Sequence, residues 1–199
     1  MKGIDSLVEK ARNYKEKGLK EKEIAVELNI SPDTVTWLLT RDVKEEKPPI
    51  DVQINWESIG VYGRRMGLLS SIFSDLIMEE MQKMEEDFDA VVGIAINGVP
   101  LAVLISEQLG KEFAVYRPGE KERSRGGGAF SSNYADLEGK RVVVVDDVIS
   151  TGETMQGAIT DVEEEGAEPI MCVVTVNKNN REEVLGVPLK SLMKARPIG

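Results

Sequence analysis

The sequence predicts an α/β fold with a parallel sheet, preceded by a small domain made only of helices. From residue 51 onward, short β-branched apolar segments alternate with segments of helical periodicity, which is the pattern of a parallel sheet with helices on its faces. Residues 1–41 show only helical periodicity. A chain of 199 residues has room for one α/β domain and one small additional module.

The N-terminal domain, residues 1–41, is predicted to contain three short helices. Apolar residues recur at helical spacing from residue 4 to residue 11, and Gly18 ends this first helix. Residues 24–28 mark the second. Ser31, followed by a proline and an acidic residue, is a strong helix start, and Val35, Leu38 and Leu39 of this third helix face inward.

Residues 42–50 are charged, end in two prolines and are interpreted as a linker to the larger domain, residues 51–199. A long helix is expected first, and the last expected strand is followed by a polar tail. The elements expected in this domain are a helix at 63–84, a strand at 90–95, a helix at 99–110, strands at 112–116 and 142–145, a helix from about 154 to 166 and a strand at 169–176.

Composition excludes some chemistries. The net charge is −10 and there is no histidine, so neither a histidine base nor a histidine metal ligand is possible. Residues 1–41 contain eight basic and seven acidic residues, so they are the part best able to approach a polyanion. The lone cysteine, Cys172, lies in an apolar segment and is expected in the core. We expect a cytoplasmic protein without a membrane segment or signal peptide.

The most informative segment is residues 142–154. Four valines predict a buried strand, Asp146 and Asp147 follow at its carboxyl end, and a Ser/Thr/Gly loop then opens a helix. Backbone N–H groups at such a helix start, with hydroxyls and the helix dipole, form an anion site. The two carboxylates can accept hydrogen bonds from a sugar. The loop residues are Ser150, Thr151, Gly152, Glu153 and Thr154.

This segment resembles, position by position, the phosphoribosyl-pyrophosphate (PRPP) signature of the type I phosphoribosyltransferases. The resemblance implies that fold, PRPP binding together with Mg²⁺, and catalytic roles for Asp146 and Asp147 in steadying the ribose. It assigns no side chain as a direct metal ligand. The alternative, an ordinary strand–turn–helix corner, leaves two adjacent carboxylates beside a buried strand with nothing to offset their repulsion.

A second loop, after the first core strand, is similar to the pyrophosphate loop of orotate phosphoribosyltransferases. Its backbone N–H groups would bind phosphate, and Gly98 would let the backbone approach the ligand closely. The alternative is a plain strand-to-helix turn. The residues concerned are Ala95, Ile96, Asn97 and Gly98.

Residues 117–133 resemble the mobile hood of the same family, which closes over pyrophosphate and neutralises it. Arg117 matches the first arginine of the hood, and Lys121 matches the lysine that carries catalysis. Pro118, Gly119 and Arg123 replace three other positions of the family pattern. A solvated basic surface loop is the alternative.

Nucleobase recognition departs most from the orotate family. That family has a Lys-Ser-Gly-type loop near the start of its catalytic domain and an Asp-Arg pair after the last core strand. Here the first region, residues 55–60, has a different sequence, and Asn177 and Lys178 stand at the second. An orotate carboxylate would lose its arginine partner. Trp56 could stack on a base or pack in a core.

Residues 20–38 resemble the helix-turn-helix of transcription regulators. Ala25 is small where two helices cross, Asn29 tolerates a left-handed turn, and Ser31 caps the recognition helix. The alternative is a helical dimerisation or regulatory cap. One such module would bind DNA weakly, so a homodimer is expected. The expected DNA-binding residues are Ser31, Thr34, Thr36, Trp37, Thr40 and Arg41.

Together the two halves resemble archaeal regulators that are similar to orotate phosphoribosyltransferases and carry an N-terminal helix-turn-helix. The resemblance implies a DNA-binding transcriptional regulator that senses PRPP or a related phosphoribosyl compound. The alternative function is an active phosphoribosyltransferase that transfers ribose 5-phosphate from PRPP to a nucleobase and releases pyrophosphate.

Overall fold

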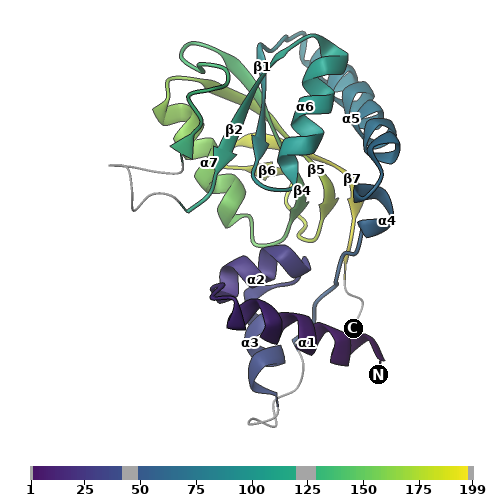
Figure 1. Cartoon of the computed structure of the whole chain (residues 1–199). Helices are drawn as coiled ribbons and strands as arrows, with labels where there is room; N and C mark the ends of the chain where they lie inside the picture. Colours follow the sequence, from purple (N-terminus) through teal and green to yellow (C-terminus); the bar gives the residue numbers. More distant parts are fainter. Residues whose placement is uncertain (1, 42–48, 120–128, 197–199) are drawn as a thin grey trace. The chain divides into compact units, whose positions relative to one another are not determined.

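The computed structural model describes residues 2–41, 49–119 and 129–196. The chain divides into two compact units (Figure 1). The first comprises residues up to Ser58 together with the C-terminal residues from Ala195, and the second spans Ile59–Lys194. Each unit has its own hydrophobic core.

The first unit contains the three predicted helices, α1 (Lys2–Glu16), α2 (Glu21–Leu28) and α3 (Pro32–Thr40). Asn29 ends α2 in the left-handed conformation with φ 52°, and the Ser31 hydroxyl caps α3 by accepting from the Thr34 N–H at 3.1 Å. The three helices close around one small core. Its buried members are Val8, Ala11, Ile24, Ala25, Leu28, Ile30, Val35 and Leu38.

The second unit is built on a sheet whose strand order, within the described residues, is β3-β2-β1-β4-β5-β7-β6. The five central strands run parallel, as predicted, and the short strands β3 and β6 pair antiparallel at the two edges. The bounds are β1 (Ala90–Ile94), β2 (Glu112–Arg117), β3 (Ala129–Phe130), β4 (Arg141–Ile149), β5 (Glu168–Asn177), β6 (Glu183–Val184) and β7 (Val187–Lys194).

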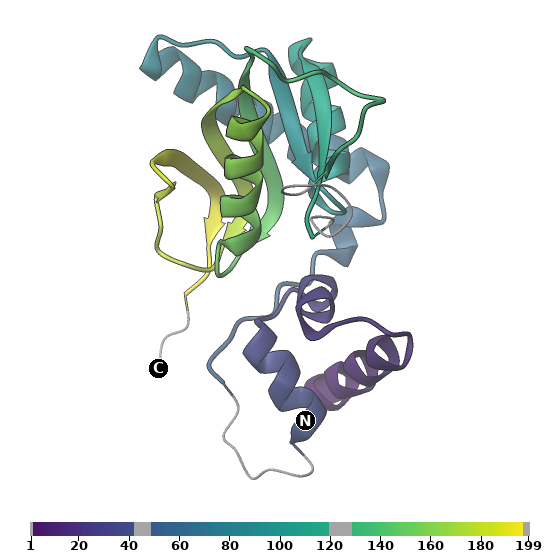
Figure 2. The same ribbon diagram turned by 90° about the vertical axis from the view of Figure 1, so that its left-hand side faces the viewer.

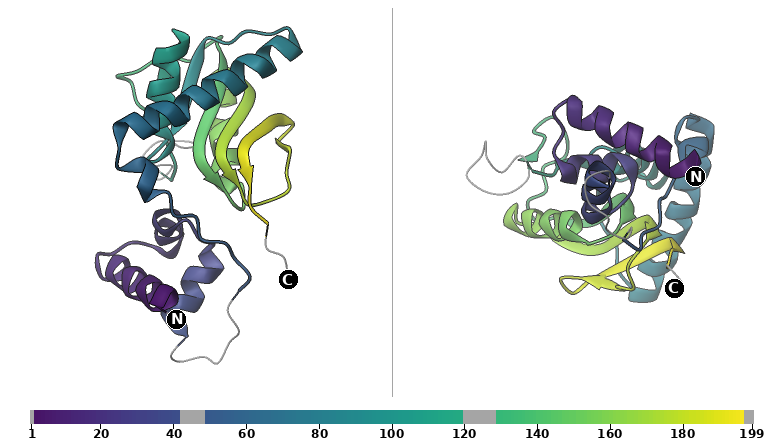
Figure 3. Two further views of the ribbon diagram at one scale, coloured as in Figure 1. Left: turned by 90° about the vertical axis from the view of Figure 1, so that its right-hand side faces the viewer. Right: turned by 90° about the horizontal axis from the view of Figure 1, so that it is seen from below.

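Helices cover both faces of this sheet. Helix α7 (Glu153–Glu164) lies in front of the strands in Figure 2, whereas α5 (Gly63–Met84) lies in front of the opposite face in the left view of Figure 3. Helix α6 (Gly98–Leu109) packs beside α5 and against β1 and β4. A single turn, α4 (Glu57–Gly60), precedes α5. The sheet is therefore covered on both sides, which explains the nearly continuous burial of β1 and β4.

Two expectations about the strands were wrong. Asp146 and Asp147 do not follow the signature strand: they belong to β4, because β4 keeps pairing with β5 as far as Ile149. The expected polar tail contains β6 and β7. Strand β7 pairs in parallel with β5, and its alternating residues Val187 and Leu189 are buried.

Candidate functional site

Strands β1 and β4 are parallel neighbours, so the loops that follow them lie at the same edge of the sheet. A hydrogen bond joins these two loops. The Asn97 side-chain amide donates from Nδ2 to Oδ2 of Asp147 at 3.0 Å. The structure therefore brings together the two segments that the sequence suggested for binding phosphate and sugar.

The two carboxylates are held in an environment that disfavours their charge. Asp147 is only 5% exposed and Asp146 is half-buried. Burial raises the pKa of Asp146 well above its ordinary value, and the neighbouring Asp147 raises it further. Burial also raises the pKa of Asp147, while hydrogen bonds, including the one from Asn97, oppose that shift. Both carboxylates are thus poised to gain from hydroxyl donors or positive charge in a ligand.

Backbone groups fix the direction of both side chains. The Asp147 N–H donates to Oδ1 of Asp146 at 2.8 Å, and the Val148 N–H donates to Oδ1 of Asp147 at 2.9 Å. Among the described residues, no lysine or arginine forms an ion pair with either carboxylate, and no three His, Cys, Asp or Glu side chains converge as a metal site.

The signature loop leads directly into α7. Gly152 precedes the helix with φ +85°, a left-handed conformation that favours glycine. The first N–H groups of α7 have no partner within the helix, and the helix dipole points its positive end at the loop. Thr151 adds a hydroxyl, which accepts from the Glu153 N–H at 3.4 Å. The signature loop thus ends at a helix N-terminus, and anion binding there stays a prediction.

Gly98 is required for a reason that we did not predict. A Cβ at this position would collide with the Val145 carbonyl oxygen and lie 3.1 Å from Cα of Asp146. The glycine thus lets the start of α6 contact β4, and its expected role in close approach to a ligand stays a prediction. Beside it, the peptide bond between Ala95 and Ile96 is cis, and Ile96 is 72% exposed.

A third segment, which sequence reasoning missed, lies against the signature loop. The Lys178 N–H donates to the Ile149 carbonyl at 2.9 Å, and the Asn179 amide donates to the Ser150 carbonyl at 2.7 Å. In the sequence, Asn177 and Lys178 stand out only as a departure from the orotate family's pattern. Its contacts with the signature loop depend on the tertiary pairing of β4 with β5.

The hood residues are only partly described. Arg117 ends β2 with an exposed side chain. Lys121 lies outside the described residues, so its catalytic role stays a prediction.

The residues expected to bind DNA are less uniformly outward-facing than the sequence suggested. Trp37 packs half-buried against the core of the first unit, because its position on α3 borders the apolar face. The Ser31 N–H and the Thr34 hydroxyl both donate to Oδ2 of Asp51, at 2.6 and 2.9 Å. Arg41 forms an ion pair with Asp5 at 2.8 Å.

The two remaining hydroxyls bond within the first unit. The Thr36 hydroxyl donates to Glu21 at 2.9 Å, and that of Thr40 donates to the Thr36 carbonyl at 2.8 Å. Thr36 is nevertheless exposed on α3, whereas Thr34 is already engaged in holding the start of the helix.

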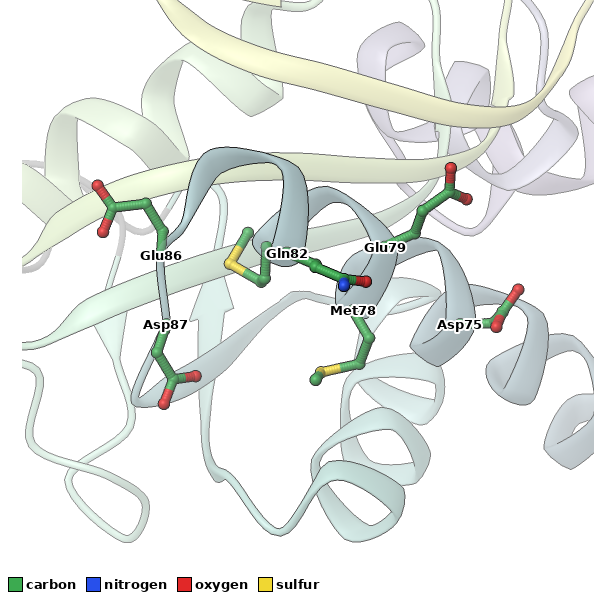
Figure 4. A pocket seen from close by; sticks show the side chains of 7 residues that line it. Asp75, Met78, Glu79, Gln82, Glu86 and Asp87 are labelled. Atoms are coloured by element: carbon green, nitrogen blue, oxygen red, sulfur yellow. The ribbon is translucent and has the colours of Figure 1, made fainter.

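A pocket over the C-terminal half of α5 is a separate feature (Figure 4). Four of its lining side chains are acidic, so it would repel a phosphate. It therefore does not compete with the signature loop as an anion site. The lining residues are Asp75, Met78, Glu79, Met81, Gln82, Glu86 and Asp87.

Comparisons with known proteins agree with the fold and the signature. A family model described as the phosphoribosyl transferase domain matches residues 68–192. Transcriptional regulator GfcR of Thermoplasma acidophilum is 47% identical over 199 residues, covering 100% of this chain and 99% of that protein. Transcriptional regulator GfcR of Archaeoglobus fulgidus is 40% identical over 197 residues, covering 98% of each.

Solved structures show the same fold. The orotate phosphoribosyltransferase of Mycobacterium tuberculosis in complex with PRPP has a TM-score of 0.57 at 20% identity, covering 71% of this chain and 80% of that one. The adenine phosphoribosyltransferase of Thermoanaerobacter pseudethanolicus also scores 0.57, at 19% identity, covering 88% of this chain and all of that one. The chain thus belongs to the phosphoribosyltransferase-domain family, among the archaeal transcriptional regulators named GfcR.

Proposed function

We propose that this regulator binds DNA through its first unit and senses PRPP, or a related phosphoribosyl compound, through its second. The observation that carries the proposal is the edge where the Asn97 loop meets Asp147 and the signature loop. The strand that carries two carboxylates with raised pKa values leads through the signature loop into a helix N-terminus, which suits a ligand that combines sugar hydroxyls with a phosphate. Mg²⁺ would accompany PRPP and offset part of its charge.

The base side of the site favours sensing over catalysis. Asn177 stands where the orotate family has its aspartate, and its amide is already used within the chain. Its Nδ2 donates to the Arg181 carbonyl at 2.9 Å, and its Oδ1 accepts from the Asn179 N–H at 2.9 Å. With only 1% of its surface exposed, Asn177 has little capacity left to recognise a nucleobase.

The second candidate function is an active phosphoribosyltransferase. It is favoured by the retained signature with Asp146 and Asp147, and by Lys121 at the hood position. Incubating the full chain with Mg²⁺, PRPP and a panel of bases separates the two functions. A pure sensor binds PRPP and releases no pyrophosphate with any base, whereas release at ordinary turnover with one base identifies an enzyme.

DNA binding through a helix-turn-helix is supported by three helices whose turn and cap have the expected geometry. The left-handed Asn29 and the capping Ser31 define the turn before α3. The relatives are named transcriptional regulators, which supports an activity on DNA and a cytoplasmic location. Selecting bound duplexes from a random pool, with and without PRPP, tests both DNA binding and its control by the ligand.

We propose that the chain forms a homodimer through the outer face of α5. Leu68 and Ile72 are 60% and 56% exposed there, one helical turn apart. Antiparallel packing of α5 on its copy about a two-fold axis would bury these two apolar residues against each other. An Ile72→Asp variant that stays dimeric in analytical ultracentrifugation would contradict this surface.

A further inference from the structure

The loop between β5 and β6 places a guanidinium group at the signature loop. The Nη1 atom of Arg181 lies 3.2 Å from the point where a Cβ on Gly152 would stand, and its Cζ lies 3.9 Å from that point. Gly152 immediately precedes α7, whose first N–H groups form the anion site. The cation and the helix N-terminus are therefore side by side, although they come from different segments of the chain.

This placement is held by a ladder of asparagine hydrogen bonds. The Arg181 N–H donates to Oδ1 of Asn179 at 3.0 Å, and the Arg181 carbonyl accepts from the buried Asn177 amide at 2.9 Å. Asn179 in turn donates to the Ser150 carbonyl at 2.7 Å. The backbone that carries Arg181 is thus fixed to the signature loop itself, while the side chain is exposed and able to reach a ligand.

The negative charge of the signature favours a basic group beside the anion site. The signature contributes three acidic residues, Asp146, Asp147 and Glu153, and no basic residue. Without a basic side chain, only the helix N–H groups would offset the repulsion between these acidic residues and a phosphate dianion. A guanidinium offers paired donors that match phosphate oxygens, and within the described residues Arg181 forms no ion pair that would have to break first.

From this geometry we infer that Arg181 binds the 5-phosphate of the phosphoribosyl ligand and is an anion-binding residue supplied from outside the signature. The inference rests on the proposed sensing function. It assigns the 5-phosphate and the pyrophosphate of PRPP to different places. Arg181 lies at Gly152, whereas the pyrophosphate is expected at the Asn97 loop. Loss of Arg181 therefore weakens the binding of ribose 5-phosphate and leaves the binding of inorganic pyrophosphate unchanged.

The test is isothermal titration calorimetry of the full chain with ribose 5-phosphate and, separately, with Mg²⁺ and pyrophosphate. Arg181→Ala is expected to weaken ribose 5-phosphate binding roughly ten- to a hundredfold, the usual effect of losing a charged hydrogen bond, and to leave pyrophosphate binding within about twofold. The affinity of Arg181→Lys for ribose 5-phosphate should lie between those of the wild type and Arg181→Ala. Arg64→Ala removes an exposed arginine from α5 and should bind both ligands like the wild type.

The outcomes are distinguishable. If the wild type binds ribose 5-phosphate and Arg181→Ala binds it equally well, the role of Arg181 is wrong and the proposed sensor survives. Equal weakening of both ligands in Arg181→Ala overturns the assignment to the 5-phosphate. If the wild type binds neither compound nor PRPP, the proposed function fails, and the inference fails with it.

Discussion

Asn97 and Asp147 are 50 positions apart in the sequence, yet their side chains share a hydrogen bond of 3.0 Å across the edge of the sheet. The bond joins the loop after β1 to the carboxyl end of β4. It also partly offsets the effect of burial on the Asp147 carboxyl, whose pKa stays raised. The pair therefore links the geometry of the site to its electrostatics.

Replacing Asp147 should affect PRPP affinity and the free energy of unfolding differently. Asp147→Asn is expected to weaken PRPP affinity in calorimetry, because a sugar hydroxyl loses a charged acceptor. It should change the free energy of unfolding little, because removing a buried carboxylate whose pKa is raised is offset when either the Asn97 amide or the Val148 N–H loses its acceptor. Asp75→Asn, on the exposed face of α5, should change neither quantity. Unchanged PRPP affinity in Asp147→Asn would remove this residue from the site.

The raised pKa values also predict a pH dependence. A carboxyl group whose pKa is raised on folding contributes stability below its unfolded pKa, and that contribution is lost as pH rises through the folded pKa. The wild type should therefore lose stability, relative to an Asp146→Asn/Asp147→Asn double variant, as pH rises from about 4. Denaturant titrations of both proteins between pH 4 and 8 measure this difference. A constant difference over that range would contradict the raised values.

Gly98 should tolerate no larger side chain. Gly98→Ala forces a Cβ against the Val145 carbonyl, so the start of α6 must move away from β4. The expected loss is about 1–3 kcal/mol of unfolding free energy, the range for overpacking a filled interior. Gly67→Ala is the matched control: it lies within α5, meets nothing within 4 Å and should be neutral or stabilising. Equal stability of the two variants would show that the contact is not restrictive.

Asp51 should stabilise helix α3. Its Oδ2 accepts from both the Ser31 N–H and the Thr34 hydroxyl, so Asp51→Ala leaves two donors without their acceptor. We expect a loss of about 1 kcal/mol, as for a helix cap, seen as faster hydrogen exchange across α2 and α3. Glu27→Ala, an exposed position on α2, is the comparison variant. Faster exchange confined to the second unit would refute the role of Asp51.

Arg41 offers a test of the DNA-binding face. Arg41→Ala should weaken operator binding and reduce the slope of log affinity against log salt by about 1, because one phosphate contact is lost. Asp5→Asn keeps Arg41 and removes its partner at 2.8 Å, so it should strengthen binding. If both variants bind with the wild-type salt slope, Arg41 does not contact DNA.

Much of the fold could be predicted from the sequence because its signals are local. A few neighbouring residues are enough to predict each of these structures: the Ser31 cap, the Asn29 turn and the valine strand β4. What escaped prediction depends on tertiary pairing. Strand β7 forms by pairing with β5, which the local sequence does not reveal. Arg181 lies close to Gly152 only because β4 and β5 are neighbours. The same holds for Gly98, whose neighbour Val145 is distant in sequence.

The most direct test of the central claim is calorimetric titration of the full chain with PRPP in the presence of Mg²⁺, alongside the Asp146→Asn/Asp147→Asn variant. The account predicts saturable binding by the wild type and a loss of at least tenfold in affinity in the variant, as for the loss of charged hydrogen bonds. Equal affinity of the two proteins, or no binding by the wild type, would contradict it.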